Sequence, residues 1–223
     1  MEIKYTLQGY IIYCAIAAYL AAFITMAAAK QKAGRMLFFI GFILSALAFI
    51  YRWFHVGHVP LQNFFEVFIC LGMVCYPISW FCQRKLKVGA QWADMLIAVV
   101  VLFPAGFIFE AEPQHLPPML QSVLFLPHVA VYMLSYIFMA KAVVQAFLQL
   151  IVKKNYSTDT LEPEKATYIM VCAGFPLLTL GLILGSIWGK LAWGDYLNWD
   201  PKELWSLACW FAYVGYFHFL YMF

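Results

Sequence analysis

The sequence has little charge. Of its 223 residues, 11% are charged, whereas about a quarter are charged in a typical soluble domain. Hydrophobic residues account for 65% of the chain. So few charges cannot cover a surface that faces water, which argues against a soluble or disordered chain and against a secreted disulfide scaffold. The net charge of +3 is also too small to indicate a nucleic-acid partner.

Closely paired cysteines are also lacking. None of the six cysteines forms a CxxC pair, which excludes a zinc knuckle and a thioredoxin-like motif. We interpret the cysteines as small residues that face lipid or the protein core, because all lie in or at the edge of apolar stretches: Cys14, Cys70, Cys75, Cys82, Cys172 and Cys209.

Long apolar runs, by contrast, are abundant. A spanning helix needs about 20 mostly apolar residues, because backbone polar groups in lipid must be satisfied within their own segment. We therefore predict an all-α fold, a polytopic membrane helix bundle that forms one domain over residues 1–223. About seven spans are expected, of which the second and fourth are short: 10–29, 36–53, 64–81, 92–109, 127–152, 168–188 and 204–223.

Basic residues predict the orientation of the spans, since cytoplasmic loops carry an excess of lysine and arginine. One set of alternate loops holds nine: Lys30, Lys32, Arg35, Arg84, Lys85, Lys87, Lys153, Lys154 and Lys165. The other side holds four: Lys4, Arg52, Lys190 and Lys202. The loops at 54–63, 110–126 and 189–203 are therefore expected outside. An odd number of spans then ends in the cytoplasm without a basic anchor, so we expect that the chain lacks a C-terminal span.

One expected external loop, residues 188–205, is rich in tryptophan. It holds four of the eight tryptophans, together with glycines, a proline and alternating acids and lysines. An aromatic belt at the membrane interface is one explanation. The other is a flat apolar platform with polar edges, suited to a large planar ligand with charged substituents. Asp200 and Pro201 also resemble the cap and first turn of a helix.

Two histidines are candidate ligands. His218 is expected inside the seventh span, where an ionisable group indicates function, and His128 is expected at the outer end of the fifth. Histidine is the usual axial ligand of haem iron. His128, Tyr132 and Tyr136 share one helical face, which predicts either a polar pocket wall or simple packing. The two histidines are expected at different depths, so one haem cannot use both as its axial pair.

The tryptophan-rich segment resembles the "WWD" signature of the CcsA/ResC family of system II cytochrome c biogenesis, written WGxYWxWDPKExW. Leu197 and Leu204 depart from the family pattern. Shorter similarities lie at Gly57–Leu61 with Asn63 and Glu66, at His128-Val129 with Ser135-Tyr136, and at Tyr216–His218. The matching residues of the signature are Trp193, Gly194, Tyr196, Trp199, Asp200, Pro201, Lys202, Glu203 and Trp205.

This resemblance implies a protein of the bacterial inner membrane with its tryptophan-rich loop on the outer face. It implies non-covalent haem b as substrate, a CcsB/ResB-type membrane partner, apocytochrome c as acceptor, and a role as a component of a cytochrome c synthase, with no catalytic residue assigned. His128 and His218 would ligate haem iron at separate positions. The implied haem-binding residues are His128, His218, Trp193, Gly194, Tyr196, Trp199, Asp200, Pro201, Glu203 and Trp205.

Other functions stay open. A CcmC-type haem delivery module would share the tryptophan motif without synthase activity. A membrane b-type electron carrier would need paired histidines at matched depth, and an unrelated transporter would bind no porphyrin. Charge alone also makes Arg52, Lys190 and Lys202 candidates for pairing with haem propionates, and His58 and His115 have weaker cases as ligand contacts.

Overall fold

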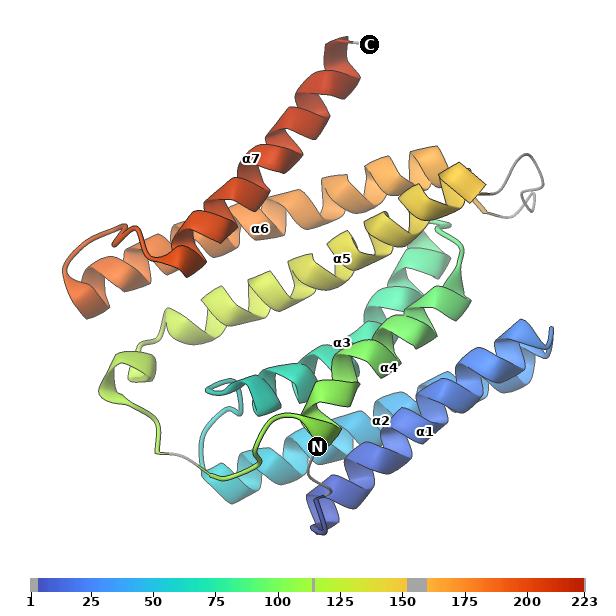
Figure 1. Cartoon of the computed structure of the whole chain (residues 1–223), viewed down its shortest axis with the longest axis horizontal. Helices are drawn as coiled ribbons and strands as arrows, with labels where there is room; N and C mark the ends of the chain where they lie inside the picture. The colour runs from blue at the N-terminus through green and yellow to red at the C-terminus, as the bar shows by residue number, and fades with distance from the viewer. Residues whose placement is uncertain (1–3, 114, 152–159, 223) are drawn as a thin grey trace.

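The chain is all-helical wherever its structure is described. The computed structural model describes residues 4–113, 115–151 and 160–222, and these contain no β-strand. The predicted fold class is therefore confirmed (Figure 1). A short 3-10 turn, η1 (Pro118–Gln121), precedes α5, and the described helices are α1 (Leu7–Ala27), α2 (Gln31–Val56), α3 (Phe64–Lys85), α4 (Gln91–Phe107), α5 (Phe125–Ile151), α6 (Pro163–Trp193) and α7 (Pro201–Met222).

Each predicted span corresponds to one helix, with differences at the ends. The second was expected to be short, but α2 has 26 residues because it begins at Gln31 and continues to Val56. Five helices are long and apolar enough to cross a membrane, namely α1, α2, α3, α5 and α6. The apolar helix α4 has 17 residues and is shorter than that. The helix α7 has 22 residues and is not among these five. It contains tryptophans and tyrosines, and the polar atoms of these side chains lower its hydropathy.

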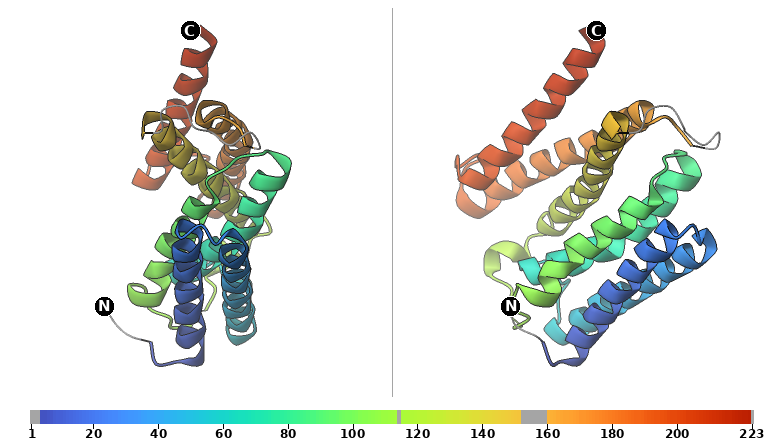
Figure 2. Two further views of the ribbon diagram at one scale, coloured as in Figure 1. Left: turned by 90° about the vertical axis from the view of Figure 1, so that its right-hand side faces the viewer. Right: turned by 45° about the vertical axis from the view of Figure 1, so that its right-hand side comes forward.

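The helices form two groups and one outlying element. Helices α1 to α4 pack against one another, and α5 and α6 form a second antiparallel pair (Figures 1 and 2). α5 joins the groups by contacts with α3 and α4. α7 diverges from α6 and contains no buried residue. It is held by aromatic contacts near its middle, where the Trp210 and Phe175 rings stack at 5.8 Å and Trp210 Nε1 donates to Thr179 Oγ1 at 2.9 Å.

The connections gather at two ends of the bundle. One end, here called the basic end, carries the α1–α2 turn, the α3–α4 turn and the start of α6, with Lys30, Arg84 and Lys165 among its residues. The other, here called the tryptophan end, carries the start of α1 and the connections at 57–63, 108–124 and 194–200. Lys153 and Lys154, which contributed to the predicted orientation, lie outside the described residues.

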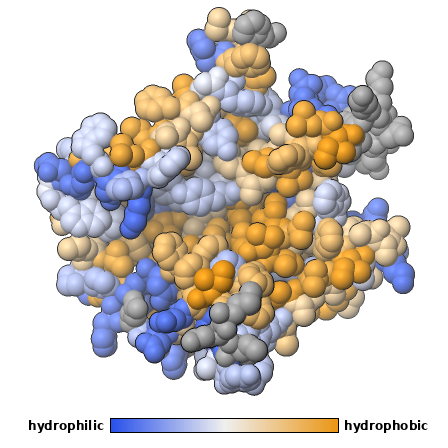
Figure 3. Space-filling model, in the orientation of Figure 1, coloured by the Kyte–Doolittle hydropathy of each residue, from blue (hydrophilic) through white to orange (hydrophobic). Residues whose placement is uncertain are grey.

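The surface is consistent with a lipid environment. In the space-filling view, apolar side chains cover much of the face between the two ends, and hydrophilic residues gather toward the ends (Figure 3). Large apolar side chains such as Ile43, Leu47 and Val100 are exposed at 41%, 49% and 61%. These findings support a multi-pass membrane protein.

A buried ion pair joins the two groups of helices near the basic end. Lys141 of α5 donates to both carboxylate oxygens of Asp94 of α4, at 2.7 and 2.6 Å. Ser79 of α3 donates to the same carboxylate at 2.5 Å, and the Lys141 and Gln145 side chains both donate to the carbonyl of Gly89. This cluster could not be predicted from local sequence, because its members come from three helices.

Candidate functional site at the tryptophan end

The tryptophan-rich segment is mostly helical. We predicted a loop over residues 188–205, and this is wrong, because α6 continues to Trp193 and α7 begins at Pro201. At 31 residues, α6 is about 46 Å long, which exceeds the roughly 30 Å hydrocarbon core of a bilayer. Trp188 and Trp193 therefore lie on the last turns of α6, and Trp205 lies on α7. Trp199 is the only one of the four in the 194–200 connection.

The connection after α6 folds back on that helix. Gly194 ends α6 in the left-handed region, with φ of 95°, and its N–H donates to the carbonyl of Lys190 at 3.1 Å. Glycine suits this conformation because it has no Cβ to clash. Ser186 donates to the carbonyl of Tyr196 at 3.0 Å, and Lys190 Nζ lies 5.5 Å from the Tyr196 ring centroid. Lys190 Nζ also donates to the Gly194 carbonyl, so its ammonium is engaged locally.

The start of α7 is capped as predicted. The carboxylate of Asp200 accepts the N–H of Glu203 at 2.9 Å, and Pro201 is the first residue of the helix. The carboxylate of Glu203 in turn accepts the N–H of Asn198 at 2.7 Å, which resembles the reciprocal bonds of a capping box. Trp199 has φ of 57°, a conformation rare for a bulky residue. The caps therefore hold a strained tryptophan, 65% exposed, at the surface.

His128, the fourth residue of α5, is held against two glycines of α6. Its Nδ1 lies 2.8 Å from the carbonyl oxygen of Gly181. A carbonyl can only accept, so Nδ1 carries the proton and the lone pair of the neutral ring is on Nε2. A Cβ built on Gly185 would lie 2.5 Å from His128 Cε1. Only glycine at position 185 leaves room for the imidazole in this place.

Trp188 connects His128 to the rest of the segment. Its ring stacks on the imidazole with centroids 5.9 Å apart and an interplanar angle of 30°. Trp193 contacts Trp188 at 4.7 Å, but with an angle of 71°. This pair is edge-to-face, so it does not form the flat platform that we predicted. Trp188 Nε1 donates to the carbonyl of Met119 at 3.1 Å, and Trp205 is 73% exposed on α7.

The aromatic face of α5 lies as predicted. His128 and Tyr132 meet edge-to-face at 5.0 Å, and Tyr132 and Tyr136 meet at 5.5 Å. A Cβ on Gly181 would lie 2.9 Å from the Tyr132 ring, so the small residues of α6 also make room for this tyrosine. Tyr132 is buried, whereas Tyr136 is 50% exposed. On this face of α5, Tyr132 is therefore a packed interior residue, whereas the side chain of Tyr136 is half exposed.

His218 is not brought to His128. It lies 17 residues beyond the start of α7, which corresponds to about 25 Å along the helix, and its side chain is exposed. His128 lies in the first turn of α5, at the tryptophan end. The two histidines thus lie at different positions along their helices, and their different depths in a membrane stay a prediction.

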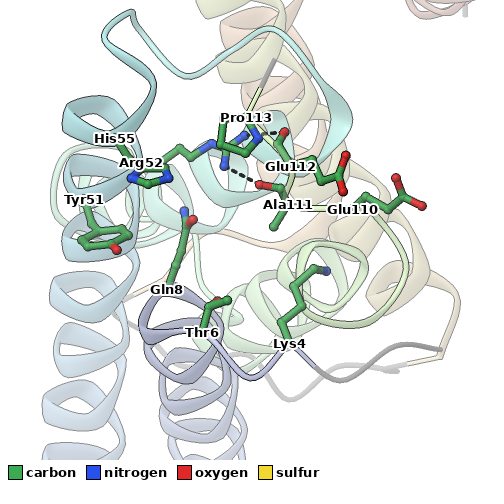
Figure 4. Close-up of a pocket in the computed structure, with 10 residues that line it drawn as sticks. All are labelled: Lys4, Thr6, Gln8, Tyr51, Arg52, His55, Glu110, Ala111, Glu112 and Pro113. Carbon is green, nitrogen blue, oxygen red and sulfur yellow. Dashed lines mark hydrogen bonds between the residues drawn. The ribbon is translucent and has the colours of Figure 1, made fainter.

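Arg52 does not fit the propionate role that its charge allowed. It is 1% exposed, and its Nε donates to Glu66 Oε1 at 2.9 Å, while Nη1 and Nη2 donate to the carbonyls of Ala111 and Glu112. Glu66 is equally buried, so the pair is part of the interior. The signal that sequence reasoning missed is that a charge in an apolar span needs a partner in another helix. Figure 4 shows the hydrogen bonds from Arg52 to the carbonyl oxygens of Ala111 and Glu112.

A cavity of about 680 Å³ opens beside Arg52, between the start of α1, the end of α2 and the chain after α4 (Figure 4). Its lining mixes charges of both signs with aromatic rings, and includes Lys4, Tyr51, His55, Glu110 and Glu112. The Tyr51 and His55 rings are stacked at 6.0 Å. This cavity is lined by other elements than the His128 site.

Comparison with known proteins identifies the family. Residues 61–222, most of the chain and including the whole His128 site, match the sequence model described as cytochrome C assembly protein. The chain belongs to this family. The sequence similarity between this chain and the family therefore extends across α3 to α7. These helices include those that carry His128, His218 and the tryptophan-rich segment.

Individual relatives of this cytochrome c assembly protein carry one name. "Cytochrome c biogenesis protein CcsA" of Chlamydomonas reinhardtii is 29% identical over 198 residues, which cover 82% of this chain and 56% of the relative. The protein of the same name from Prochlorococcus marinus (strain NATL1A) is 28% identical, covering 76% and 66%. That from Welwitschia mirabilis is 27% identical, covering 79% and 70%. The chain thus spans between about half and about 70% of these relatives' length.

Proposed function

We propose that this assembly protein binds haem at the tryptophan end of the bundle, with His128 as an axial ligand. It then presents the haem for covalent attachment to apocytochrome c. The observation that carries the proposal is the 2.8 Å contact between His128 Nδ1 and the Gly181 carbonyl. A histidine that ligates a metal through one nitrogen usually donates its other N–H to a carbonyl or carboxylate. His128 is in that state, with Nε2 left for a metal.

The residues around His128 fit a porphyrin ligand. Trp188 stacks on the imidazole and Trp193 packs on Trp188, so indole surface lies directly beside the proposed ligand atom. Trp193, Tyr196 and Trp199 are exposed at 48%, 59% and 65% although they are aromatic. Exposed aromatic side chains beside a neutral histidine are suited to an apolar planar ligand. Gly194 ends α6, and Asp200, Pro201 and Glu203 form the capped start of α7, so these residues shape the same segment from its two ends. Trp205 lies exposed on the first turns of α7 and is proposed as a further contact.

We further propose a second haem position that uses His218. An ionisable residue within a membrane span is rare unless it has a function, and we predicted that the seventh apolar stretch, which forms α7, is a span. His218 is exposed on α7, which packs mainly against α6 among the described helices. A ligand on that face would be shared with another protein. The proposed source of the second ligand is a CcsB/ResB-type membrane partner.

Haem is the substrate of this proposal, and the protein contributes position. Each thiol of a CXXCH motif in the acceptor adds across a vinyl C=C of haem: the S–H and C=C π bonds break, a C–S bond forms, and the proton goes to the other vinyl carbon, so nothing leaves. Axial histidine ligation helps to keep the iron reduced and away from oxygen chemistry. This chain would hold the iron through His128 and orient the ring edge toward the acceptor, which is catalysis by proximity. The tryptophan end then faces the outer side of the bacterial inner membrane.

The experiment that tests this proposal compares the haem content of two histidine variants. The protein is purified in detergent from haem-replete cells, alone and together with a CcsB/ResB-type partner, and its absorption spectrum is recorded. His128→Gly should lose the haem bound at the tryptophan end, and the control His55→Gly should retain it. Haem content and spectra that are identical in wild type and His128→Gly would contradict the proposal.

The same preparations separate the proposal from a CcmC-type delivery module. An apocytochrome c with an intact CXXCH motif is added or co-expressed, and covalent haem is detected after denaturation. The proposal predicts covalent product that requires both the partner and His128. Haem binding without covalent product in any combination would instead support delivery alone.

A further inference from the structure

The α4–α5 connection, residues 108–124, crosses the tryptophan end between the two groups of helices. In the parts of the connection that the structure describes, 108–113 and 115–124, the regular element is the 3-10 turn Pro118–Gln121. A segment with few internal hydrogen bonds opens readily unless other elements hold it. Among the described residues, Arg52, Gln62 and Trp188 donate to its backbone carbonyls, and each comes from a different part of the chain.

The first attachment is the strongest. Arg52 of α2 donates to the carbonyls of Ala111 at 2.6 Å and Glu112 at 3.2 Å while its Nε is paired with Glu66 of α3 (Figure 4). Both charged side chains are 1% exposed. Hydrogen bonds to a charged donor are stronger than neutral ones, and a buried guanidinium must keep its partners. The start of the connection is therefore fixed to the interface of α2 and α3.

The other two attachments follow along the connection. Gln62 Nε2, in the segment just before α3, donates to the carbonyl of His115 at 2.9 Å. Trp188 Nε1, on the last turns of α6, donates to the carbonyl of Met119 at 3.1 Å. The connection is thus tied first to α2 and α3 and finally to the tryptophan whose ring stacks on His128.

We propose that the α4–α5 connection is a positioning element for the His128 site, and that Arg52 and Trp188 are its positioning residues. The attachment by Arg52 fixes the path of the connection, and the Met119 carbonyl then fixes the rotation of the Trp188 ring. Trp188 in turn packs against both His128 and Phe125 of the first turn of α5, at 5.9 and 5.6 Å. Arg52 acts at a distance and touches no proposed ligand.

Hydrogen exchange of the purified full chain tests this coupling without any haem. Trp188→Phe retains an aromatic ring but removes the donor to Met119, so amides at 119–128 should exchange about three- to tenfold faster, as expected for loss of one hydrogen bond. Trp210→Phe is the matched control, since it removes the indole bond to Thr179 and leaves the connection untouched. Unchanged exchange at 119–128 in Trp188→Phe, or an equal increase in Trp210→Phe, would overturn the proposal.

A second pair of variants starts from the other end of the connection. Arg52→Lys keeps the charge beside Glu66 but cannot reach both carbonyls, and it should speed exchange at 119–128 as well as near 111–112. Gln62→Leu, which leaves the buried ion pair intact, provides the same test if Arg52→Lys fails to fold. If exchange becomes faster only near the substituted residue, and the amides of 119–128 exchange as in wild type, the attachments are independent of one another and the proposal is wrong.

The consequence for ligand binding rests on the proposed function. In haem-loaded protein, Trp188→Phe and Arg52→Lys should each weaken haem retention about three- to tenfold and shift its absorption bands, whereas Trp210→Phe should not. If the wild-type protein binds no haem, the proposed function fails, and the exchange experiment still decides whether the connection is coupled to the site. If wild type binds haem and both variants retain it equally well, the positioning role is wrong.

Discussion

At the scale of single residues, the site depends on small side chains opposite large ones. Gly181 and Gly185 of α6 lie one helical turn apart and face Tyr132 and His128 of α5. The imidazole is half-buried between them and Trp188, with its Nδ1 proton bound to the Gly181 carbonyl. The position of His128 thus depends on the absence of side chains at Gly181 and Gly185 of α6.

Gly185→Ala adds only one methyl group, but it should displace the His128 imidazole. The added methyl would lie 2.5 Å from Cε1, so the imidazole must move and its contact with Gly181 must lengthen. We expect a loss of about 1–3 kcal/mol in the free energy of unfolding from overpacking, and weaker haem binding. The control Gly215→Ala has nothing within 4 Å and should be neutral or slightly stabilising. Thermal unfolding and haem titration of the two variants measure the difference, and equal behaviour would contradict this account.

The cap of α7 makes a second prediction at this scale. Asp200→Ala removes the acceptor for the Glu203 N–H and should cost about 1 kcal/mol. Asp200→Asn retains a capping oxygen and should behave like wild type in stability. Hydrogen exchange at residues 202–206 is the measurement. If Asp200→Asn frays α7 as much as Asp200→Ala, the carboxylate charge rather than the cap is what matters.

At the scale of helices, the apolar runs predicted the number and order of the elements, but not their ends. The sixth span was expected to end at residue 188, just before Gly189. In the structure Gly189 lies buried inside α6, and only Gly194 adopts the left-handed conformation that ends a helix. Local sequence does not distinguish these uses of glycine. The three-helix cluster around Lys141 was likewise not predicted, since the bonded pairs Lys141–Asp94 and Ser79–Asp94 lie 47 and 15 residues apart in the sequence.

The Lys141–Asp94 pair should be essential to the joining of α5 with α3 and α4. Replacing one partner leaves an uncompensated buried charge, so Lys141→Met or Asp94→Leu alone should destabilise the protein by about 3–5 kcal/mol. The double variant removes both charges and should recover much of that loss. Thermal unfolding in detergent compares the three. A double variant that is as unstable as the sum of the single variants would show that the pair is not coupled.

At the scale of the whole molecule, one end of the bundle holds the tryptophan-rich segment 188–205 and the other holds most of the loop cations among the described residues. The sequence predicted this asymmetry from alternate loops, and the helix order places those loops together. It did not predict how α7 diverges from α6, because that depends on packing that only the three-dimensional arrangement specifies.

This asymmetry makes a prediction about topology. In intact cells, a membrane-impermeant thiol reagent should label Asp195→Cys, at the tryptophan end, and should not label Lys87→Cys, at the basic end, until the membrane is permeabilised. The unsubstituted chain, with its exposed Cys14 and Cys209, gives the background. Labelling of Lys87→Cys alone in intact cells would reverse the proposed orientation.

Rescue by free imidazole tests the central claim most directly. His128→Gly removes the proposed ligand and leaves space beside Gly185. If His128 ligates haem iron, the variant should lose haem at this site, and millimolar imidazole added during purification should restore both the haem and a wild-type spectrum. Haem binding that is unaffected by His128→Gly, or a loss that imidazole fails to restore in a folded variant, would contradict the claim.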